Sequence, residues 1–186
     1  GDEQNVSQTN MLLRNNGDFI FSDVTESAMV GDGIGLSFMG VWLDLNKDLL
    51  PDLYVINDRI FSDNSVYINN GDGSFTDISL TSGALLTGDD PMSATFGDFD
   101  NDGYMDALVG ASSFASGGHR LMKNNGDGTF LNITPNSGFH NFTGTGIEYV
   151  AQDFNNDGFI DVWCAGSNLI MYNNANLTFS PSSLTF

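Results

Sequence analysis

The sequence is short of cysteine, of positive charge and of long apolar runs, and each shortage excludes a class of protein. Cys164 is the single cysteine among 186 residues, so no intrachain disulfide can form. No apolar run approaches the roughly 18 residues of a membrane-spanning helix, so membrane insertion is not expected. The polar residues 1–10 also lack the pattern of a signal peptide.

Positive charge is scarce, because 5 Lys and Arg residues stand against 24 Asp and Glu residues and the formal net charge is −19. Nucleic acids and anionic membranes attract proteins through Lys and Arg, so neither is an expected partner. The acidic balance instead fits a protein that is secreted or displayed at the cell surface, where calcium is abundant.

Groups suited to acid–base or nucleophilic catalysis are also few. His119 and His140 are the only histidines, and neither belongs to a recognisable catalytic constellation. Cys164 lies in the apolar run 162–165 without a paired base, so we expect a buried small hydrophobe rather than a reactive thiol. The sequence therefore predicts that the chain is not an enzyme.

One short acidic loop is present three times at nearly equal spacing. The loops are 44–52 (DLNKDLLPD), 98–106 (DFDNDGYMD) and 153–161 (DFNNDGFID), and their first residues lie 54 and 55 positions apart. Together they hold 10 of the 24 acidic residues (3 + 4 + 3). A fixed period of this size predicts a repeat protein.

Each loop has the oxygen pattern of a calcium site. Ca²⁺ prefers about six to eight oxygen ligands at about 2.3–2.6 Å, which a tight loop supplies from alternate positions. Positions 1, 3, 5 and 9 carry carboxylate or amide oxygen in all three loops, and position 7 offers its backbone carbonyl. The predicted ligands of up to three Ca²⁺ ions are Asp44, Asn46, Asp48, Leu50 and Asp52, then Asp98, Asp100, Asp102, Tyr104 and Asp106, then Asp153, Asn155, Asp157, Phe159 and Asp161.

The loops differ from EF-hands, which need a bidentate Glu at position 12 and flanking helices. Position 12 is valine or cysteine here, and the flanks alternate like strands. Gly103 and Gly158 at position 6 allow the sharp reversal that aims the oxygens inward, but the first loop has Leu49 there. A solvated Asp/Asn-rich turn is the alternative interpretation of any single loop.

A second motif follows the same period. An Asn-Asn-Gly-Asp turn begins at residues 15, 69 and 124, and a decayed copy begins at residue 173. Asn-Gly and Asp-Gly between alternating apolar stretches indicate hairpins, because primed turns demand positive φ. An aromatic residue follows every turn, and we expect these residues to pack between neighbouring units: Phe21, Phe75, Phe130 and Phe179.

The second repeat shows the unit best, with predicted strands at 93–97, 106–111, 119–123 and 129–134 and no helical periodicity of useful length. Four-stranded antiparallel units of this length predict an all-β fold of tandem β-propeller blades. The expected organisation is a single arc over 1–186, with an outer hairpin of a preceding blade at 11–25 and blades at 39–80, 93–134 and 147–180. Trp42 and Trp163 fall in strand patterns, so we expect both to be buried.

These motifs resemble the FG-GAP/VCBS repeat, the blade of integrin α-subunit propellers. Phe96-Gly97 before the second loop and Gly110-Ala111 after it carry the resemblance, which extends over about 11–179. The first repeat is more similar to the related repeats of cartilage-acidic-protein and UnbV-type propellers. In the FG-GAP family the loop binds Ca²⁺, which implies ligand roles for the matching positions.

Propellers of this family usually have seven blades, whereas about three and a half are expected here. The resemblance therefore implies that other blades complete the ring, either in cis or from other copies in trans. Three functions stay open: a calcium-binding extracellular module for adhesion or for binding a protein or glycan ligand at the cell surface, a lectin-like propeller, and a scaffold within a larger surface assembly. If the chain is a lectin-like propeller, exposed aromatic residues would stack on the bound sugars.

Overall fold

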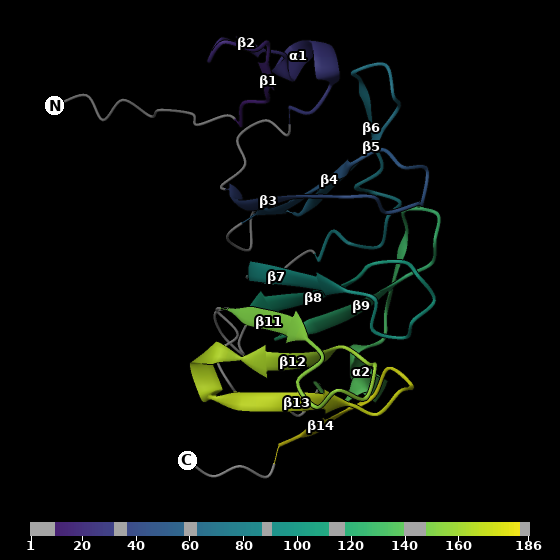
Figure 1. Cartoon of the computed structure of the whole chain (residues 1–186). Helices are drawn as coiled ribbons and strands as arrows, with labels where there is room; N and C mark the ends of the chain where they lie inside the picture. Colours follow the sequence, from purple (N-terminus) through teal and green to yellow (C-terminus); the bar gives the residue numbers. More distant parts are fainter. Residues whose placement is uncertain are drawn as a thin grey trace, which may run out of the picture.

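The computed structural model describes most of the chain as a row of small β-sheets (Figure 1). His140, one of the two histidines considered above, lies outside the described residues. The described ranges are 10–31, 37–57, 63–86, 91–111, 118–139 and 148–182.

Three four-stranded antiparallel sheets and one two-stranded sheet make up the described fold, which confirms the predicted all-β class of tandem blades. The two-stranded sheet consists of β1 (Leu13–Asn15) and β2 (Phe21–Asp23). In each complete sheet the strands pair in chain order. These sheets are β3 (Ser37–Leu43), β4 (Asp52–Asn57), β5 (Ser65–Asn69) and β6 (Phe75–Asp77); β7 (Pro91–Gly97), β8 (Asp106–Ala111), β9 (Arg120–Asn124) and β10 (Phe130–Asn132); and β11 (Tyr149–Gln152), β12 (Asp161–Cys164), β13 (Leu169–Asn173) and β14 (Phe179–Pro181).

Helices contribute little. The four-residue helices α1 (Thr25–Ala28) and α2 (Thr134–Ser137) each follow the last strand of a sheet, and a 3₁₀ turn spans Ala165–Ser167. Neither helix is predictable from the sequence, because a single turn is too short to show a 3.6-residue period. No helix among the described residues is long and apolar enough to cross a membrane.

The acidic loops and the Asn-Asn-Gly-Asp turns lie at the same end of the sheets. The loop 44–51 joins β3 to β4, whose register pairs Leu43 with Asp52, and the loops 98–105 and 153–160 hold the same place in the later sheets. Each turn joins the third strand to the fourth. Since the strands alternate in direction, both connections fall on one edge of the arc.

The core lies between neighbouring sheets rather than within one. One cluster joins β4 and β5 to the second complete sheet, and another joins β8 and β9 to the third. Phe130 and Phe179 are buried members of these clusters, and Phe75 belongs to a third cluster between α1 and the first complete sheet. These three aromatic residues confirm the predicted packing between units, but Phe21 does not, because 55% of it is exposed.

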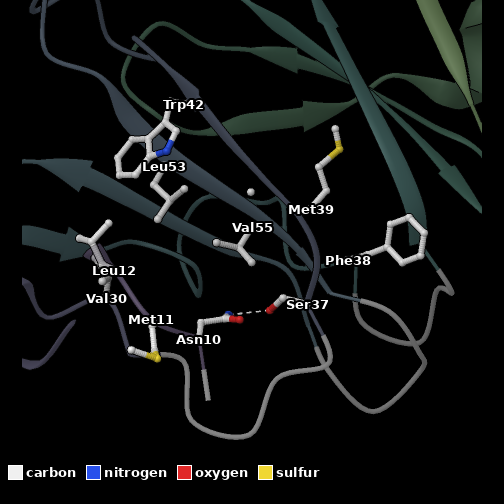
Figure 2. Close-up of a pocket in the computed structure, with 11 residues that line it drawn as sticks. Asn10, Met11, Leu12, Val30, Ser37, Phe38, Met39, Trp42, Leu53 and Val55 are labelled. Carbon is white, nitrogen blue, oxygen red and sulfur yellow. Dashed lines mark hydrogen bonds between the residues drawn. The ribbon is translucent and has the colours of Figure 1, made fainter. Parts of the chain in front are cut away.

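The prediction that both tryptophans are buried is wrong. Trp42 on β3 is 48% exposed, and Trp163 on β12 is 37% exposed. Trp42 lies on the face of the first complete sheet that is turned toward β1, where the described residues form a sheet of two strands (Figure 2). Trp163 occupies the register position of Tyr54 and Leu108, which the following sheet buries completely. Both tryptophans therefore lie on sheet faces that no complete four-stranded sheet of the described residues covers.

Cys164 and His119, the two described residues considered above as possible catalytic groups, are both buried. Cys164 is 1% exposed, and burial raises the pKa of its thiol to about 12, which agrees with the predicted small hydrophobe. His119 is buried as well, and the hydroxyl group of Tyr149 forms a hydrogen bond with its Nδ1 atom. This contact joins the start of β9 to β11, so His119 has a structural place between two sheets.

Candidate metal centre in the acidic loops

All three acidic loops adopt one backbone conformation. Position 6 has positive φ in every loop, with values of 69° at Leu49, 88° at Gly103 and 89° at Gly158. Position 4 also has positive φ throughout, at 62°, 58° and 61°. The first loop therefore keeps the shape of the others although leucine replaces glycine. The positive φ at position 4 is not predictable from the sequence, because Lys or Asn rather than glycine stands there.

The last residue of each loop has a structural role that sequence analysis did not foresee. Asp106 is fully buried, and it accepts backbone N–H groups from Phe99 at Oδ2 (3.1 Å) and from Asn124 at Oδ1 (2.8 Å). Asp52 and Asp161 accept the same pair of donors in their own sheets. Position 9 thus ties the loop to the third strand, and its remaining lone pairs are still available to a metal.

Burial perturbs the carboxyl groups at position 9. It raises the pKa of Asp106 to about 7 and also raises the pKa of Asp52, against the opposing effect of their backbone hydrogen bonds. A cation beside Asp106 would favour the ionised form instead.

The first residue of each loop closes the reversal. Asp98 accepts the N–H of Gly103 at Oδ2 (2.8 Å), and Asp44 and Asp153 accept the equivalent N–H from position 6 at 2.9 Å. The N–H of Gly158 is the main reason why the pKa of Asp153 lies below its usual value. Position 5 likewise accepts the N–H of position 7 in every loop. These backbone hydrogen bonds hold the carboxylates of positions 1 and 5 toward the inside of the loop without the help of an ion.

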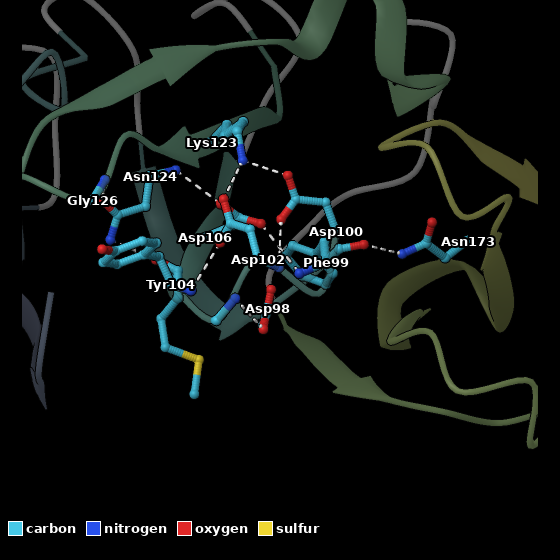
Figure 3. Close-up of polar contacts among 12 residues, drawn as sticks. Asp98, Phe99, Asp100, Asp102, Tyr104, Asp106, Lys123, Asn124, Gly126 and Asn173 are labelled. Carbon is cyan, nitrogen blue, oxygen red and sulfur yellow. Dashed lines mark hydrogen bonds and ion pairs between the residues drawn. The ribbon is translucent and has the colours of Figure 1, made fainter. Parts of the chain in front are cut away.

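The second loop has the oxygen set best suited to a hard cation. Carboxylate oxygens of Asp98, Asp100 and Asp106 lie within 4.8 Å of one another (Figure 3). Asp98 Oδ1 is buried and has no hydrogen-bond partner, so one acceptor is turned into the loop with its lone pairs free. A set of close carboxylate oxygens with an orphaned buried acceptor fits Ca²⁺, which takes only oxygen ligands here.

The first and third loops have asparagine at position 3. Asn46 Nδ2 donates to Asp48 Oδ2 at 2.9 Å, and Asn155 Nδ2 donates to Asp157 Oδ2 at 2.9 Å. The amide group thereby holds the position 5 carboxylate within the loop. Among the described residues only the second loop brings three acidic groups within 4.8 Å of one another, and the other two loops have asparagine in place of its Asp100.

A lysine that sequence analysis did not single out reaches the second loop. Lys123 on β9 forms ion pairs with Asp100 and with Asp102, the latter at 2.6 Å (Figure 3). Burial alone would lower the pKa of Lys123, but the hydrogen bonds to these carboxylates raise it above the usual value. Ile68 and Tyr172 hold the equivalent position in the other sheets, so the second loop alone has a tethered cation at this place.

Neighbouring loops also contact each other. Lys47 Nζ donates to the backbone carbonyl of Asp102 at 3.1 Å and lies 3.8 Å from the ring centre of Tyr104. Asn101 Nδ2 donates to the carbonyl of Gly158 at 3.1 Å. In both cases position 4 of one loop binds the next loop, so the acidic loops form a connected row along one edge.

The fold and the loops together define a protein of propeller-blade repeats with an acidic loop in each blade. Residues 44–109 match the family of FG-GAP-like repeats, which confirms the predicted resemblance over that part of the chain. No curated protein sequence matches the chain.

One solved structure that is similar to this chain is a lectin from Agrocybe aegerita that specifically recognises non-reducing terminal N-acetylglucosamine. The TM-score is 0.53 at 21% sequence identity, and the match covers 92% of this chain and 44% of the lectin. This chain therefore spans less than half of the lectin's length. At this identity the likeness shows the fold alone.

Proposed function

We propose that this chain is a calcium-stabilised, extracellular β-propeller module that binds a protein or glycan ligand and has no catalytic activity of its own. The orphaned oxygen of Asp98 within the carboxylate set of the second loop is the observation that carries the calcium assignment. The match to FG-GAP-like repeats over residues 44–109 supports it, because loops of that family bind Ca²⁺. The shared backbone of the three loops supports up to three ions.

Bound calcium would stabilise the arc by mass action. Extracellular calcium modules have a Kd of about 10⁻⁴–10⁻³ M. At millimolar calcium each site then contributes roughly 0.5–1.5 kcal/mol, against a total stability of about 5–15 kcal/mol. Each ion would neutralise carboxylates that otherwise repel one another where the first two strands of a blade meet.

Chelation tests this assignment. We expect EDTA to lower the Tm by roughly 3–15 °C and added calcium to restore it, because one kcal/mol shifts the Tm of a domain of this size by about 2–4 °C. Differential scanning calorimetry with and without calcium measures the effect. An unchanged Tm would contradict the calcium assignment.

Two variants test whether the calcium-dependent gain in Tm comes from the second loop. Asp98→Asn keeps the side-chain shape and removes one ligand charge, so the calcium-dependent gain in Tm should shrink by about one site's share. Asp18→Asn makes the same charge change in an exposed turn outside the acidic loops, so its calcium gain should equal that of the unchanged protein. Equal losses in both variants would point to net charge rather than to a bound ion.

Glycan binding is the second candidate function. The fold of the Agrocybe aegerita lectin and the half-exposed indoles of Trp42 and Trp163 favour it, since exposed aromatic rings stack on sugars. A glycan array in calcium tests this function, and N-acetylglucosamine is the first sugar to titrate against tryptophan fluorescence. If the chain binds a sugar and Trp42→Ala or Trp163→Ala abolishes this binding, the result would support a lectin. If no sugar on the array binds, a protein would be the expected ligand.

A further inference from the structure

The buried aspartates at position 9 of the three loops are joined to one another by a chain of hydrogen bonds. Asp106 lies at its centre, because Oδ2 accepts the N–H of Phe99 in its own loop and Oδ1 accepts the N–H of Asn124 on β9 (Figure 3). All three residues are 0% exposed, so solvent does not reach these bonds. Each of the two donor residues continues the chain toward a neighbouring loop.

Toward the first loop the chain runs through the side chain of Asn124. Its Nδ2 donates to the carbonyl of Leu45 at 2.9 Å, and the N–H of Leu45 donates to Asp52 Oδ2 at 2.8 Å. Leu45 and Asp52 are also fully buried. Two residues therefore join the position 9 carboxylates of the first and second loops.

Toward the third loop the chain runs through Phe99. The carbonyl of Phe99 accepts Asn173 Nδ2 at 2.7 Å, and the N–H of Asn173 donates to Asp161 Oδ1 at 2.8 Å (Figure 3). Asn173 and Asp161 are buried as well. The chain thus passes through the position 9 carboxylates of all three loops without a break.

The same pairs of loops are joined a second time, at the exposed edge, by the side chain of position 4. Lys47 bonds the carbonyl of Asp102, and its Nζ lies so close to the reversal that a Cβ atom on Gly103 would come within 2.3 Å of it. Asn101 bonds the carbonyl of Gly158 in the third loop. The reversals of the second and third loops are therefore held in part by the loop that precedes each of them.

From these bonds we infer that the three loops bind calcium cooperatively, with Asn124 and Asn173 as positioning residues that transmit the order of one loop to the next. The inference rests on the calcium assignment above and adds a coupling between its sites. When Asp106 holds an ion, its carboxylate is fixed, and so are the backbone groups of Phe99 and Asn124. The neighbouring position 9 carboxylates are then held in place, so less conformational entropy is lost when the next loop fills.

Electrostatics acts in the opposite direction. A filled second loop attracts the next cation less than an empty one, because the ion offsets part of the charge of its four carboxylates. Three of these, Asp98, Asp100 and Asp102, belong to residues that are partly or fully exposed. Salt screens such charges with a Debye length of about 8 Å at physiological ionic strength. The buried chain is screened much less, so we expect the coupling through it to exceed the electrostatic effect.

Removal of the middle site tests the coupling. Calcium is titrated into the protein in sodium chloride of about 0.15 M. NMR follows the backbone amides of Leu49, Gly103 and Gly158, which stand at position 6 of the three loops, so each loop reports its own occupancy. In Asp98→Asn we expect the calcium midpoints at Leu49 and Gly158 to rise about fivefold, at the lower end of the usual range of about 5- to 150-fold. Midpoints that stay unchanged, or that fall, would overturn the inference.

Asp127→Asn is the matched charge control. Asp127 lies in an exposed turn at the same end of the second complete sheet. The equivalent Asn176 of the third sheet makes the same two hydrogen bonds to the threonine that follows it by two residues, so the turn tolerates the change. We expect no shift of the midpoints at Leu49 and Gly158. Equal shifts in both variants would mean that the loops respond to net charge, which would also overturn the coupling.

Asn173→Ser tests the route. It removes the amide that bonds the second loop, so the shift that Asp98→Asn causes at Gly158 should shrink in this background. The shift at Leu49 should keep its full size, because the bonds between the first and second loops are intact. A shift at Gly158 of unchanged size would contradict the role assigned to Asn173. Asp98→Asn alters no residue of the buried chain, so the coupling is testable even if Asn173→Ser fails to fold.

Asn69→Ser is the control for this variant. Asn69 stands at the equivalent position after β5, but its Nδ2 donates to Pro51 of its own loop at 3.0 Å and joins no two loops among the described residues. Both shifts caused by Asp98→Asn should therefore persist in its background. Loss of the shift at Gly158 here as well would show that Asn173→Ser acts through general destabilisation, and would count against the route.

A second pair of variants leaves the buried residues untouched. Asn101 and Asn156 are exposed and have φ values of 58° and 61°, which glycine adopts readily. Asn101→Gly removes the bond to Gly158 and should shrink the shift there. Asn156→Gly removes no bond to another described loop and should leave that shift unchanged. Equal results from the two variants would contradict a contribution of position 4.

The coupling and the calcium assignment fail in different ways. If none of the three amides responds to calcium, the assignment fails and the coupling fails with it. If the loops fill but the midpoints at Leu49 and Gly158 do not depend on Asp98, the assignment stands and the coupling alone is overturned.

Discussion

At the scale of single residues, the first loop keeps the left-handed backbone conformation of position 6 although leucine replaces the glycine found there in the other two loops. Leu49 has a φ of 69° and is 90% exposed, so it holds a left-handed conformation without burying its side chain. A non-glycine residue in this region costs roughly 1–2 kcal/mol. The hydrogen bond from its N–H to Asp44 and the shared loop geometry hold it there.

Leu49→Gly should therefore stabilise the protein. Relief of the left-handed strain, less the extra entropy that glycine gains in the unfolded chain, leaves a gain of about 1 kcal/mol and a Tm rise of roughly 2–4 °C. Thermal unfolding in calcium measures the gain. Leu49→Ala removes the same exposed side chain but keeps the strain, so a similar gain in that variant would attribute the effect to lost apolar exposure.

Lys123 makes the second loop differ from the others. Its ammonium group binds Asp100 and Asp102, where a calcium ion would need the same oxygens. Lys123→Met should lower the stability measured in EDTA and raise the calcium affinity of the second loop by up to about fivefold, since an ion pair that water still reaches contributes about 0.2–1 kcal/mol. Isothermal titration calorimetry measures the affinity, and unfolding in EDTA measures the stability.

The matched control is Lys47→Met, which changes net charge equally but removes a contact to the backbone carbonyl of Asp102 rather than to a carboxylate. Its effect on calcium affinity should be clearly smaller. Equal effects of the two variants would show that Lys123 acts through overall charge and does not compete for the ligand oxygens.

At the scale of elements, the bounds of a strand were predictable from the sequence where a motif lies at one end of the strand. β8 begins at Asp106 and ends at Ala111 as predicted, because the acidic loop fixes its start and a run of small apolar residues fills it. β10 is shorter than predicted and ends at Asn132, where α2 follows at Thr134. β7 begins earlier, at Pro91, across a register shift. Strand ends set by packing or by a bulge carry no periodic signal.

The candidate site was predictable in its residue types but not in its bonding. The spacing of carboxylates predicted the three loops, yet nothing in the spacing showed that Asp106 ties Phe99 to Asn124. Those partners come from different strands, so only the folded sheet brings them together. The contribution of Lys123 was hidden for the same reason, since 21 residues separate it from Asp102 in the chain.

At the scale of the whole molecule, the arrangement in Figure 1 explains why burial predictions failed at the two ends and held in the middle. A strand pattern predicts which residues share a face, but it does not predict whether another sheet covers that face. Tyr54 and Leu108 are covered by a following sheet, whereas Trp163 at the same register position is exposed. The pattern of side chains thus repeats along the chain while their burial depends on the neighbours that each unit has.

The net charge yields a prediction for the molecule as a whole. The formal charge is −19, and three bound Ca²⁺ ions would bring it to −13 (−19 + 6). Self-repulsion destabilises a compact state, and salt screens it with a Debye length of about 10 Å at 0.1 M. In EDTA, raising sodium chloride from low to physiological concentration should therefore raise the Tm, and in saturating calcium the same change should raise it less. Thermal scans across the two salt series measure the difference. Equal salt dependence in EDTA and in calcium would mean that the loop carboxylates do not carry the repulsion, and that calcium would have to act by shaping the loops rather than by neutralising them.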